Sequence, residues 1–242
     1  MSELFERATV GEIVATDFRA AGVFERFGID FCCGGRRSIA EACRAAAADP
    51  DAVERALQGL SPRAAHHDDD LTRWPAGRLI DHILAVHHAY VRSALPAIAG
   101  HLAKLMDVHG GRHPELSRVA ATFDEMGGDL LQHMMKEERV LFPYIRELAS
   151  ASGPSRVSPF GTVENPIRMM EREHREAGDE MHRIRELTGD FTVPADGCAT
   201  YSVCFEELAA FERDLHRHIH IENNVLFPKA MALEAPSDRH DA

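Results

Sequence analysis

Two His-x-x-x-Glu pairs are the residues of this sequence whose type and spacing have the clearest chemical meaning. His133 precedes Glu137 by four positions, and His218 precedes Glu222 by the same interval. The same ending, Val-Leu-Phe-Pro, follows both pairs at the same distance. Because residues four apart share one face of a helix, each pair can direct an imidazole and a carboxylate at one point.

Both pairs lie on rows of apolar residues that recur at steps of three and four, as on the core-facing side of an amphipathic helix. The row around the first pair contains Val119, Phe123, Met126, Leu130, Val140 and Tyr144, and the row around the second contains Cys204, Leu208, Phe211, Leu215 and Val225. A buried carboxylate is costly unless it is paired or binds a metal. Two carboxylates at matching places therefore predict a shared cationic partner.

Each half of the chain adds one more histidine on an apolar row. His88 lies between Ile80 and Val91 on one row, and His174 lies between Met170 and Met181 on another. The separation of these two histidines almost equals that of the two His-x-x-x-Glu pairs. The chain is therefore predicted to contain a duplicated helical hairpin that directs four imidazoles and two carboxylates into a bundle.

The expected metal centre follows from this set of ligands. Nitrogen and oxygen ligands without a cysteine pair on the rows disfavour structural zinc. Carboxylates that can bridge, with imidazoles around them, suit a di-iron or di-manganese centre in a helical bundle, and spacing alone does not separate the two metals. If Glu137 and Glu222 bridge, each metal receives two imidazoles and keeps an open position. A buried polar cluster without metal is the alternative.

The other histidines of the helices are expected to face solvent or to support the ligands from outside. They are His82, His87, His182, His216 and His220. Outer partners commonly orient the imidazoles that bind a metal. Glu138 and Glu173 are candidates for that role, although each is equally compatible with a plain surface acid.

The pattern along the chain predicts an all-α protein with two domains. A small N-terminal helical domain is expected over residues 1–62, a linker over 61–72, and an up-down four-helix bundle over 73–235. The bundle helices are expected at about 76–107, 114–149, 165–187 and 197–233. Pro96 is expected to kink the first of them, and Pro143 and Pro228 to bend both halves at one level.

Composition excludes several classes of protein. The net charge is −12 and no basic patch stands out, which disfavours nucleic-acid binding. No apolar run approaches the roughly 20 residues of a membrane helix, and no secretory signal is visible at the N-terminus. The five cysteines are odd in number and form no disulfide framework, which indicates a reducing cytoplasm.

Two neighbouring cysteines, Cys32 and Cys33, stand before two glycines in the N-terminal region, and this segment is expected to open a helix. Thiols at the start of a helix can have a lowered pKa. The pair could therefore undergo oxidation, bind a metal or react with nitric oxide. The sequence is equally compatible with a tight turn of small residues that has no chemical role. Cys43 and Cys204 are expected to be buried and inert, and Cys198 is undecided.

Taken together, these motifs resemble the repair-of-iron-centres family of the YtfE/ScdA type. Residues 30–35, Asp-Phe-Cys-Cys-Gly-Gly, are similar to the signature of its N-terminal ScdA-type domain. Residues 133–138, 173–178 and 222–228 are similar to its hemerythrin-like domain. The resemblance covers nearly the whole chain, with several motifs in the same order.

This resemblance implies a non-haem di-iron centre with an oxo or hydroxo bridge, in a hemerythrin-like four-helix bundle. Its terminal ligands are His88, His133, His174 and His218, and its bridges are Glu137 and Glu222. His87 precedes His88 where an aromatic residue is more usual, and it is a competing candidate ligand.

The implied function is repair of iron–sulfur clusters damaged by oxidative or nitrosative stress, in the cytoplasm and with homodimerisation allowed. The route is iron donation, reduction of nitric oxide to nitrous oxide, or both, with Cys32 and Cys33 as a redox relay. The alternative is a protein that binds or senses dioxygen or nitric oxide without catalysis. Four histidines, one fewer than in the oxygen carriers of this fold, argue against it.

Overall fold

The computed structural model describes residues 8–60, 70–150 and 160–235, and helices dominate all three ranges. The only extended pairing within them is an isolated bridge between Thr9 and Ser38. The all-α prediction is therefore confirmed for the described residues. Most of the predicted linker lies outside these residues. Every helix in the described ranges is too short or too polar to cross a lipid bilayer.

The described chain divides into two compact units. The first takes its residues from Met1–Ile80, Ile145–Ile167 and Arg217–Ala242, and the second from Asp81–Tyr144 and Arg168–His216. Some boundaries between the units fall inside a helix, so such a helix contributes residues to both units.

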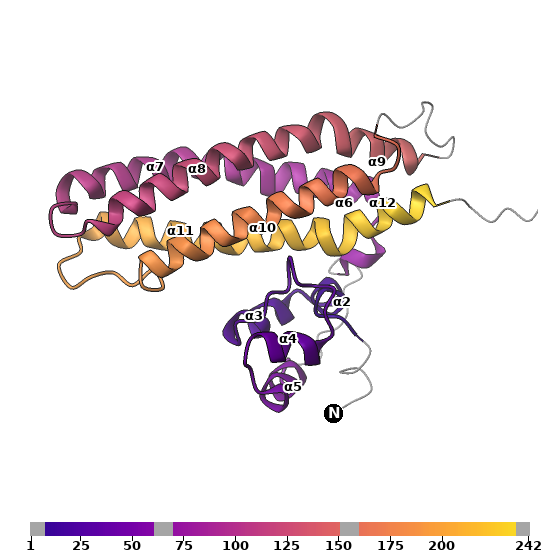
Figure 1. Cartoon of the computed structure of the whole chain (residues 1–242), viewed down its shortest axis with the longest axis horizontal. Coiled ribbons are helices and arrows are strands. Elements are labelled where there is room, and N and C mark those ends of the chain that lie inside the picture. The colour runs from indigo at the N-terminus through magenta and orange to yellow at the C-terminus, as the bar shows by residue number, and fades with distance from the viewer. Residues whose placement is uncertain (1–7, 61–69, 151–159, 236–242) are drawn as a thin grey trace, which may run out of the picture. The chain divides into compact units, whose positions relative to one another are not determined.

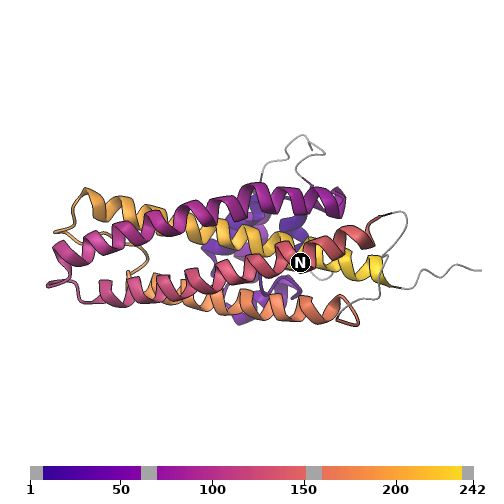
Figure 2. The same cartoon turned by 90° about the horizontal axis from the view of Figure 1, so that it is seen from above.

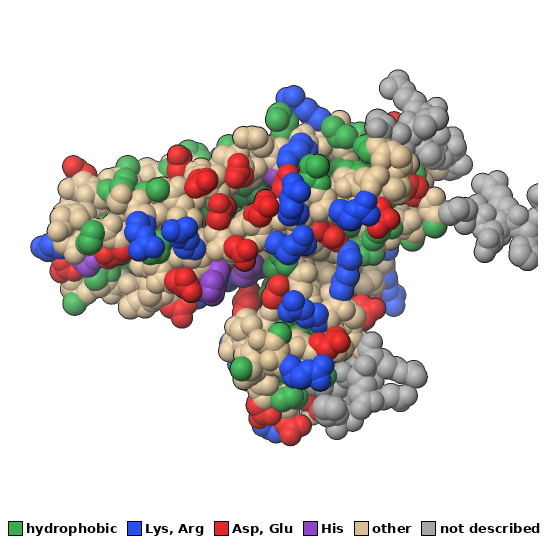
Figure 3. Space-filling model, viewed as in Figure 1, with side chains coloured by type: hydrophobic (Ala, Val, Ile, Leu, Met, Phe, Trp, Pro, Cys, Tyr) green, Lys and Arg blue, Asp and Glu red, His purple; other side chains and the backbone are tan. Residues whose placement is uncertain are grey.

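Four long helices supply most of the second unit. They are α7 (Ala89–His109), α8 (Glu115–Lys136), α10 (Glu164–Leu187) and α11 (Ala199–Ile221). Within that unit these helices run side by side in both ribbon views (Figure 1, Figure 2). Charged side chains lie along their outside on the face drawn in Figure 3. This arrangement is the helical bundle that the apolar rows predict.

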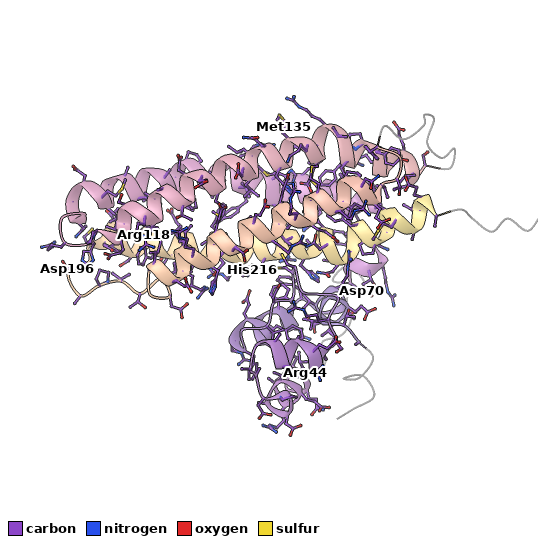
Figure 4. The ribbon with its side chains drawn as sticks, viewed as in Figure 1. Arg44, Asp70, Arg118, Met135, Asp196 and His216 are labelled. Carbon is purple, nitrogen blue, oxygen red and sulfur yellow. The ribbon has the colours of Figure 1, made fainter. Side chains whose placement is uncertain are left out.

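The predicted apolar rows form the core of the second unit. Val119, Phe123 and Met126 on α8 are almost fully buried, as is Phe211 on α11. The rings of Phe123 and Phe211 meet edge to face at 5.5 Å between centroids. Met135, which lies between these rows on the surface of α8, points away from the bundle and is 42% exposed (Figure 4). Burial of one face of each helix is thus what holds the four together.

Three π-helical turns interrupt the regular helices of the described ranges. They are η2 (Ile83–His88), η3 (Glu137–Leu141) and η4 (Glu222–Leu226). Each lies between α-helical segments: α6 (Ala76–His82) precedes η2, α9 (Phe142–Leu148) follows η3, and α12 (Phe227–Glu234) follows η4. A π-turn adds one residue to the helix and is often found at functional sites. Here each turn begins or ends at a residue predicted to bind metal.

The extra residue of η3 overturns part of the predicted apolar row. Val140 was expected in the core but is 47% exposed, and Leu141 is buried in its place with 1% exposure. Tyr144 is displaced in the same way, and Ile145 is fully buried. The reason is that one inserted residue rotates everything after it around the helix axis, so a row extrapolated at the α-helical period misses the core.

The predicted helix limits agree with the structure to within about two residues. The first helix continues from Ala76 to His109 through η2, and α7 remains helical across Pro96. The other three bundle segments span Glu115–Leu148, Glu164–Leu187 and Ala199–Glu234. Pro143 and Pro228 each stand at the second position of the segment that follows a π-turn. A proline lacks the N–H that an unbroken α-helix would use there, which explains why the pattern changes at this point.

The first unit contains the N-terminal helices. They are α2 (Val10–Thr16), α3 (Arg19–Arg26), α4 (Ile39–Ala45) and α5 (Pro50–Gln58), followed by the short turn η1 (Leu71–Arg73). Ser38 and Glu41 form a capping box at the start of α4, and Thr9 and Glu12 form another at α2. Helix α2 contacts η4 within this unit.

Candidate metal centre

All six residues predicted to bind metal lie in the interior, each with 2% exposure or less. They are His88 on η2, His133 near the end of α8, Glu137 at the start of η3, His174 on α10, His218 near the end of α11 and Glu222 at the start of η4. Each long helix or the π-turn beside it therefore contributes to the set. Burial of two carboxylates among imidazoles is the arrangement that calls for a compensating charge.

Glu137 lies between two imidazoles in the second unit. Its Oε2 is 3.4 Å from His88 Nε2, and its Oε1 is 3.4 Å from His133 Nε2. His133 Nε2 in turn lies 3.0 Å from Nε2 of His174. One carboxylate with a different imidazole at each oxygen has the geometry of a bridging ligand.

The second His-x-x-x-Glu pair has the same internal geometry in the first unit. His218 Nε2 lies 3.1 Å from Glu222 Oε1, across the last turn of α11 and the first residue of η4. Helical spacing alone brings this pair together, as the sequence predicts.

Two overlapping groups of these side chains are compact enough to hold a metal ion. One group is His88, Glu137, His218 and Glu222, and the other is His133, Glu137, His174 and Glu222. Within each group the ligand atoms lie within 4.8 Å of one another. Ligands bound to one ion at about 2.1 Å are separated by up to about 4.2 Å, so each group is close to that size. Both carboxylates belong to both groups, which is the pattern of two ions sharing two bridges.

Two outer carboxylates determine which ring nitrogen of the histidines faces inward. Glu138 Oε1 lies 2.7 Å from His88 Nδ1, and Glu173 Oε2 lies 2.9 Å from His133 Nδ1. An ionised carboxylate only accepts hydrogen bonds, so Nδ1 carries a proton and Nε2 is the nitrogen directed to the interior. The sequence left Glu138 and Glu173 as equal candidates for this role or for the surface, and in the structure each contacts an imidazole of the predicted ligand set.

These outer carboxylates have a lowered pKa. The hydrogen bond from His133 is the largest cause for Glu173 and, with Lys136 Nζ at 2.5 Å, lowers its pKa to about 2 against the opposing effect of burial. Burial likewise acts to raise the pKa of Glu138, but hydrogen bonds from Arg92 and His88 outweigh it and lower the pKa overall. Both groups are therefore ionised at neutral pH.

Two of the remaining histidines, His87 and His220, are buried, although they were expected to face solvent or to support the ligands from outside. His87 is buried beside His88 because η2 turns both side chains inward, and its Nδ1 lies 2.9 Å from Asp214 Oδ1. His220 is fully buried with its ring centroid 5.8 Å from that of Phe31. Burial lowers the pKa of His220 to about 4. His87 belongs to neither compact group, so the structure does not bring it to the predicted centre.

Cys32 and Cys33 lie in a turn that Asp30 organises. Asp30 Oδ1 accepts the backbone N–H of Cys32 at 3.0 Å and that of Cys33 at 2.9 Å. The expected opening of a helix is wrong, because α4 begins only at Ile39. The hydrogen bond to Cys33 and then burial raise the pKa of the Cys32 thiol, where a helix start would have lowered it.

Asn223 and Asn224, which sequence reasoning missed, attach this turn to η4. Asn223 Nδ2 donates to the Cys32 carbonyl at 3.3 Å, and Asn224 Nδ2 donates to the carbonyls of Phe31 and Cys32, both at 3.1 Å. The two amides follow Glu222 directly in the chain. Their signal in the sequence was a pair of polar residues inside an otherwise apolar helix ending.

The other three cysteines fall into two kinds. Cys43 and Cys204 are fully buried, as predicted, and burial raises the pKa of both thiols, that of Cys204 to about 12. Cys198 is exposed just before α11, with Sγ 3.4 Å from His109 Nε2. That hydrogen bond, helped by backbone N–H groups of Tyr201 and Thr200, lowers the pKa of Cys198 to about 7.

Comparison with known proteins identifies both parts of the chain. Residues 6–61 match the ScdA_N domain, a domain of unknown function, and residues 79–230 match the hemerythrin HHE cation binding domain. A probable iron–sulfur cluster repair protein of Haemophilus influenzae is 32% identical over 94% of this chain and 98% of its own length. The iron–sulfur cluster repair protein YtfE of Dickeya chrysanthemi is 35% identical over 92% and 96%.

A further relative, the iron–sulfur cluster repair protein YtfE of Enterobacter sp., is 33% identical over 95% of this chain and 99% of its own length. These matches extend over both domains, and the hemerythrin HHE match contains every residue of the buried His and Glu groups. The chain therefore belongs to the family of YtfE-type iron–sulfur cluster repair proteins.

Proposed function

We propose that this protein repairs iron–sulfur clusters damaged by oxidative or nitrosative stress, by means of a di-iron centre in its helical bundle. The observation that carries the proposal is the pair of buried four-residue groups that share Glu137 and Glu222. Relatives that match more than nine-tenths of the chain are named iron–sulfur cluster repair proteins, which supports the same function.

The proposed ligand set gives each iron two imidazoles and a share in both carboxylates. His88 and His218 would hold one ion and His133 and His174 the other, and both ions would share Glu137, Glu222 and an oxo or hydroxo group. Nitrogen and carboxylate ligands of this kind suit iron in a bundle core. Bound in the ferrous state, the pair would supply either iron itself or two electrons.

The residues around the proposed centre have separate tasks. Glu138 and Glu173 hold the Nδ1 protons of His88 and His133 and keep the opposite nitrogens available as ligands. The stacked ring of Phe142, 5.8 Å from that of His88, covers one side of the imidazole with apolar surface. Such packing restricts water and fixes the orientation of the ligand.

Two chemical routes are compatible with this function. In the first, iron is the cargo, and it passes to a partner protein that has lost iron from its cluster. In the second, two molecules of nitric oxide, two electrons and two protons give nitrous oxide and water, which removes the damaging agent. Cys32 and Cys33 would serve the second route as a redox relay.

One anaerobic experiment separates the two routes. Diferrous protein is mixed with nitric oxide, and the headspace is analysed for nitrous oxide. In parallel, diferrous and iron-free protein are each mixed with a nitrosylated cluster protein, and recovery of the cluster is followed by electron paramagnetic resonance. Nitrous oxide supports reduction, whereas repair by the diferrous protein alone, without nitrous oxide, supports donation.

Two results would contradict the proposed function. Repair by the iron-free protein at the same rate as by the iron-loaded protein would show that the metal centre is not involved. A reversible, long-lived dioxygen adduct without any repair would favour the alternative, a protein that binds dioxygen.

The proposed function also implies a cellular compartment, partner proteins and an oligomeric state. We place the protein in the cytoplasm, because its five cysteines are odd in number and their spacing is not that of a disulfide framework. Damaged iron–sulfur proteins are the expected partners, and nitric oxide or dioxygen is the expected small molecule. The family resemblance allows homodimerisation, and analytical ultracentrifugation tests it.

A further inference from the structure

The turn at residues 30–35, here called the cysteine turn, gathers a second set of metal-binding groups. The sulfur atoms of Cys32 and Cys33 lie 4.0 Å apart, and Cys32 Sγ lies 3.3 Å from Asp30 Oδ1. One ligand atom from each of the three residues lies within 4.8 Å of the other two. None of these residues belongs to the groups formed by the bundle histidines.

The spacing within the cysteine turn is close to that of an occupied site. Two sulfur atoms bound at about 2.3 Å to one tetrahedral ion lie about 3.8 Å apart, and a sulfur and a carboxylate oxygen lie about 3.5 Å apart. The observed sulfur–sulfur distance of 4.0 Å and the observed sulfur–oxygen distance of 3.3 Å each differ from the expected distance by only a few tenths of an ångström. Binding an ion would therefore require only small movements of the side chains.

We propose that Asp30, Cys32 and Cys33 form a mononuclear site for a divalent thiophilic cation, separate from the centre in the bundle. A divalent ion displaces the two thiol protons and is held by two thiolates and one carboxylate. The fourth tetrahedral position stays open to an outside ligand. The choice of ferrous iron as the natural occupant rests on the proposed function, but the site itself does not.

The backbone around the cysteine turn holds the three ligands in place. A side chain at Gly34 would bring its Cβ to 2.9 Å from the Asp30 carbonyl oxygen and 3.0 Å from Asp30 Oδ2. A Cβ at Gly35 would collide with Asn224. Glycine is therefore required at both positions. Gly34 leaves space for the Asp30 carboxylate, and Gly35 leaves space for the Asn224 amide that holds the turn.

The fixing amides come from η4. Asn224 Nδ2 binds the carbonyls of Phe31 and Cys32, and Asn223 Nδ2 binds the Cys32 carbonyl as well. These bonds use backbone oxygen atoms only and leave the Cys32 and Cys33 sulfurs available for an ion. The turn is thus preorganised by groups outside the ligand set, as in well-built metal sites.

The exposure of the ligands suits a site that exchanges its ion. Cys32 is 7% exposed, Cys33 is half-buried and Asp30 is exposed. The site is therefore protected from solvent at Cys32 and accessible to solvent at Asp30. A thiolate of an acceptor protein can occupy the open position and then replace a ligand of the turn. Closed four-ligand sites are structural, whereas a site with an open position can exchange or react.

The test is an anaerobic titration of the full-length, iron-loaded protein with Co²⁺ in the presence of a reductant that does not bind metals. Thiolate-to-cobalt charge-transfer absorption reports sulfur ligands, which the bundle groups of histidine and glutamate do not provide. We expect this absorption to saturate at one equivalent of Co²⁺ in the wild type. Cys198→Ser is the matched control, because it removes an exposed thiol elsewhere and should leave the titration unchanged.

Three variants assign the ligands. Cys32→Ser and Cys33→Ser should each remove the charge-transfer absorption of the one-equivalent site. Asp30→Asn keeps an oxygen for the backbone N–H groups but loses the charge, so it should weaken Co²⁺ binding at least tenfold. Absence of the absorption in the wild type, or its retention in both serine variants, overturns the proposal.

A measurement on the wild type alone keeps the test valid if a variant fails to fold. Bound Co²⁺ should protect Cys32 and Cys33 from alkylation, as read by peptide mass spectrometry, and leave Cys198 unprotected. Equal alkylation with and without Co²⁺ contradicts the proposal. The iron content of the bundle and the repair assay are measured on the same samples. Failure of the cysteine turn site is thereby distinguished from failure of the proposed function.

Discussion

His88 and His133 show how single residues define the candidate centre. Each uses Nδ1 for an outer carboxylate, Glu138 or Glu173, and directs Nε2 towards Glu137. The tautomer needed by a ligand is thus set before any ion binds. In the proposed centre, a bound ion would compensate for the charge of Glu137, which is fully buried.

Replacement of Glu137 by glutamine tests the proposed bridge. A neutral amide cannot bridge two cations through charged oxygen atoms, so we expect the iron content to fall from two ions per chain to one or fewer. Iron is measured by a colorimetric assay and Mössbauer spectroscopy after anaerobic reconstitution. Glu147→Gln, on the exposed side of α9, is the control and should keep both ions. Retention of two ions by Glu137→Gln would remove this residue from the ligand set.

Replacement of Glu173 by glutamine tests the outer partner of His133. The amide can still contact the ring but no longer favours one tautomer, and loss of such a partner typically weakens metal binding by about 10–100-fold. Competition with a chelator measures the change. Glu176→Gln, exposed on the same helix, should have no effect, and an equal effect of both variants would indicate a general charge effect instead.

Cys198 should be the most reactive thiol at neutral pH. The hydrogen bond from His109 lowers its pKa to about 7, and a thiol reacts only as the thiolate. Its alkylation rate should therefore rise through pH 7 and level off above pH 8, while Cys204, with a pKa of about 12, stays unreactive. Peptide mass spectrometry after timed alkylation measures both rates. In His109→Gln the midpoint should move to higher pH, and an unchanged midpoint would show that His109 does not lower it.

The three π-turns are the structural elements that distinguish this bundle from a regular one. At η3 the extra residue rotates the helix face, so Leu141 is buried where the α-helical row predicts Val140. Glu137 and Glu222 both stand at the first position of such a turn. The turns therefore fix where the carboxylates lie and which residues of α9 and α12 reach the core.

A pair of alanine variants tests the rotation at η3. Leu141→Ala removes a buried side chain and should lower the free energy of unfolding by about 2–5 kcal/mol. Val140→Ala changes an exposed residue and should alter it by only about 0.5 kcal/mol. Urea denaturation of the iron-free proteins measures both. The opposite order would mean that the α-helical row continues through Glu137 and that the π-turn is absent.

On the scale of the whole molecule, the proposed metal centre should couple ion binding to the stability of the fold. The candidate ligands come from four separate helices, and the unfolded chain does not hold them together. Any ion that binds only the folded chain stabilises it by mass action. The bundle should therefore be distinctly less stable without metal.

Removal of iron tests this coupling. At a free-ion concentration about 100 times the dissociation constant, binding contributes about 2.7 kcal/mol, and a chain of this size gains about 2–4 °C in Tm per kcal/mol. Chelation should thus lower Tm by roughly 5–10 °C, measured by circular dichroism under anaerobic conditions. Glu137→Gln should show a smaller difference between its metal-loaded and metal-free forms. Equal Tm values for the loaded and iron-free wild type would show that the ions do not bind the folded bundle preferentially.

The sequence by itself determined the helical class, the bundle segments and the six inward-facing residues. Each of these depends on local spacing, because the helical period places His133 with Glu137 and His218 with Glu222 whatever the rest of the chain does. The mutual approach of His88, Glu137 and His133 also agrees with the rows on which they lie.

Only the tertiary structure decided the π-turns, the outer partners and the setting of the cysteine turn. Glu173 reaches His133 from another helix, His87 turns inward beside His88, and Asn224 binds a loop far away in the sequence. Contacts of this kind join residues that no periodic pattern relates. They are selected by packing in three dimensions, so a one-dimensional pattern can suggest a candidate residue but cannot say which partner it will meet.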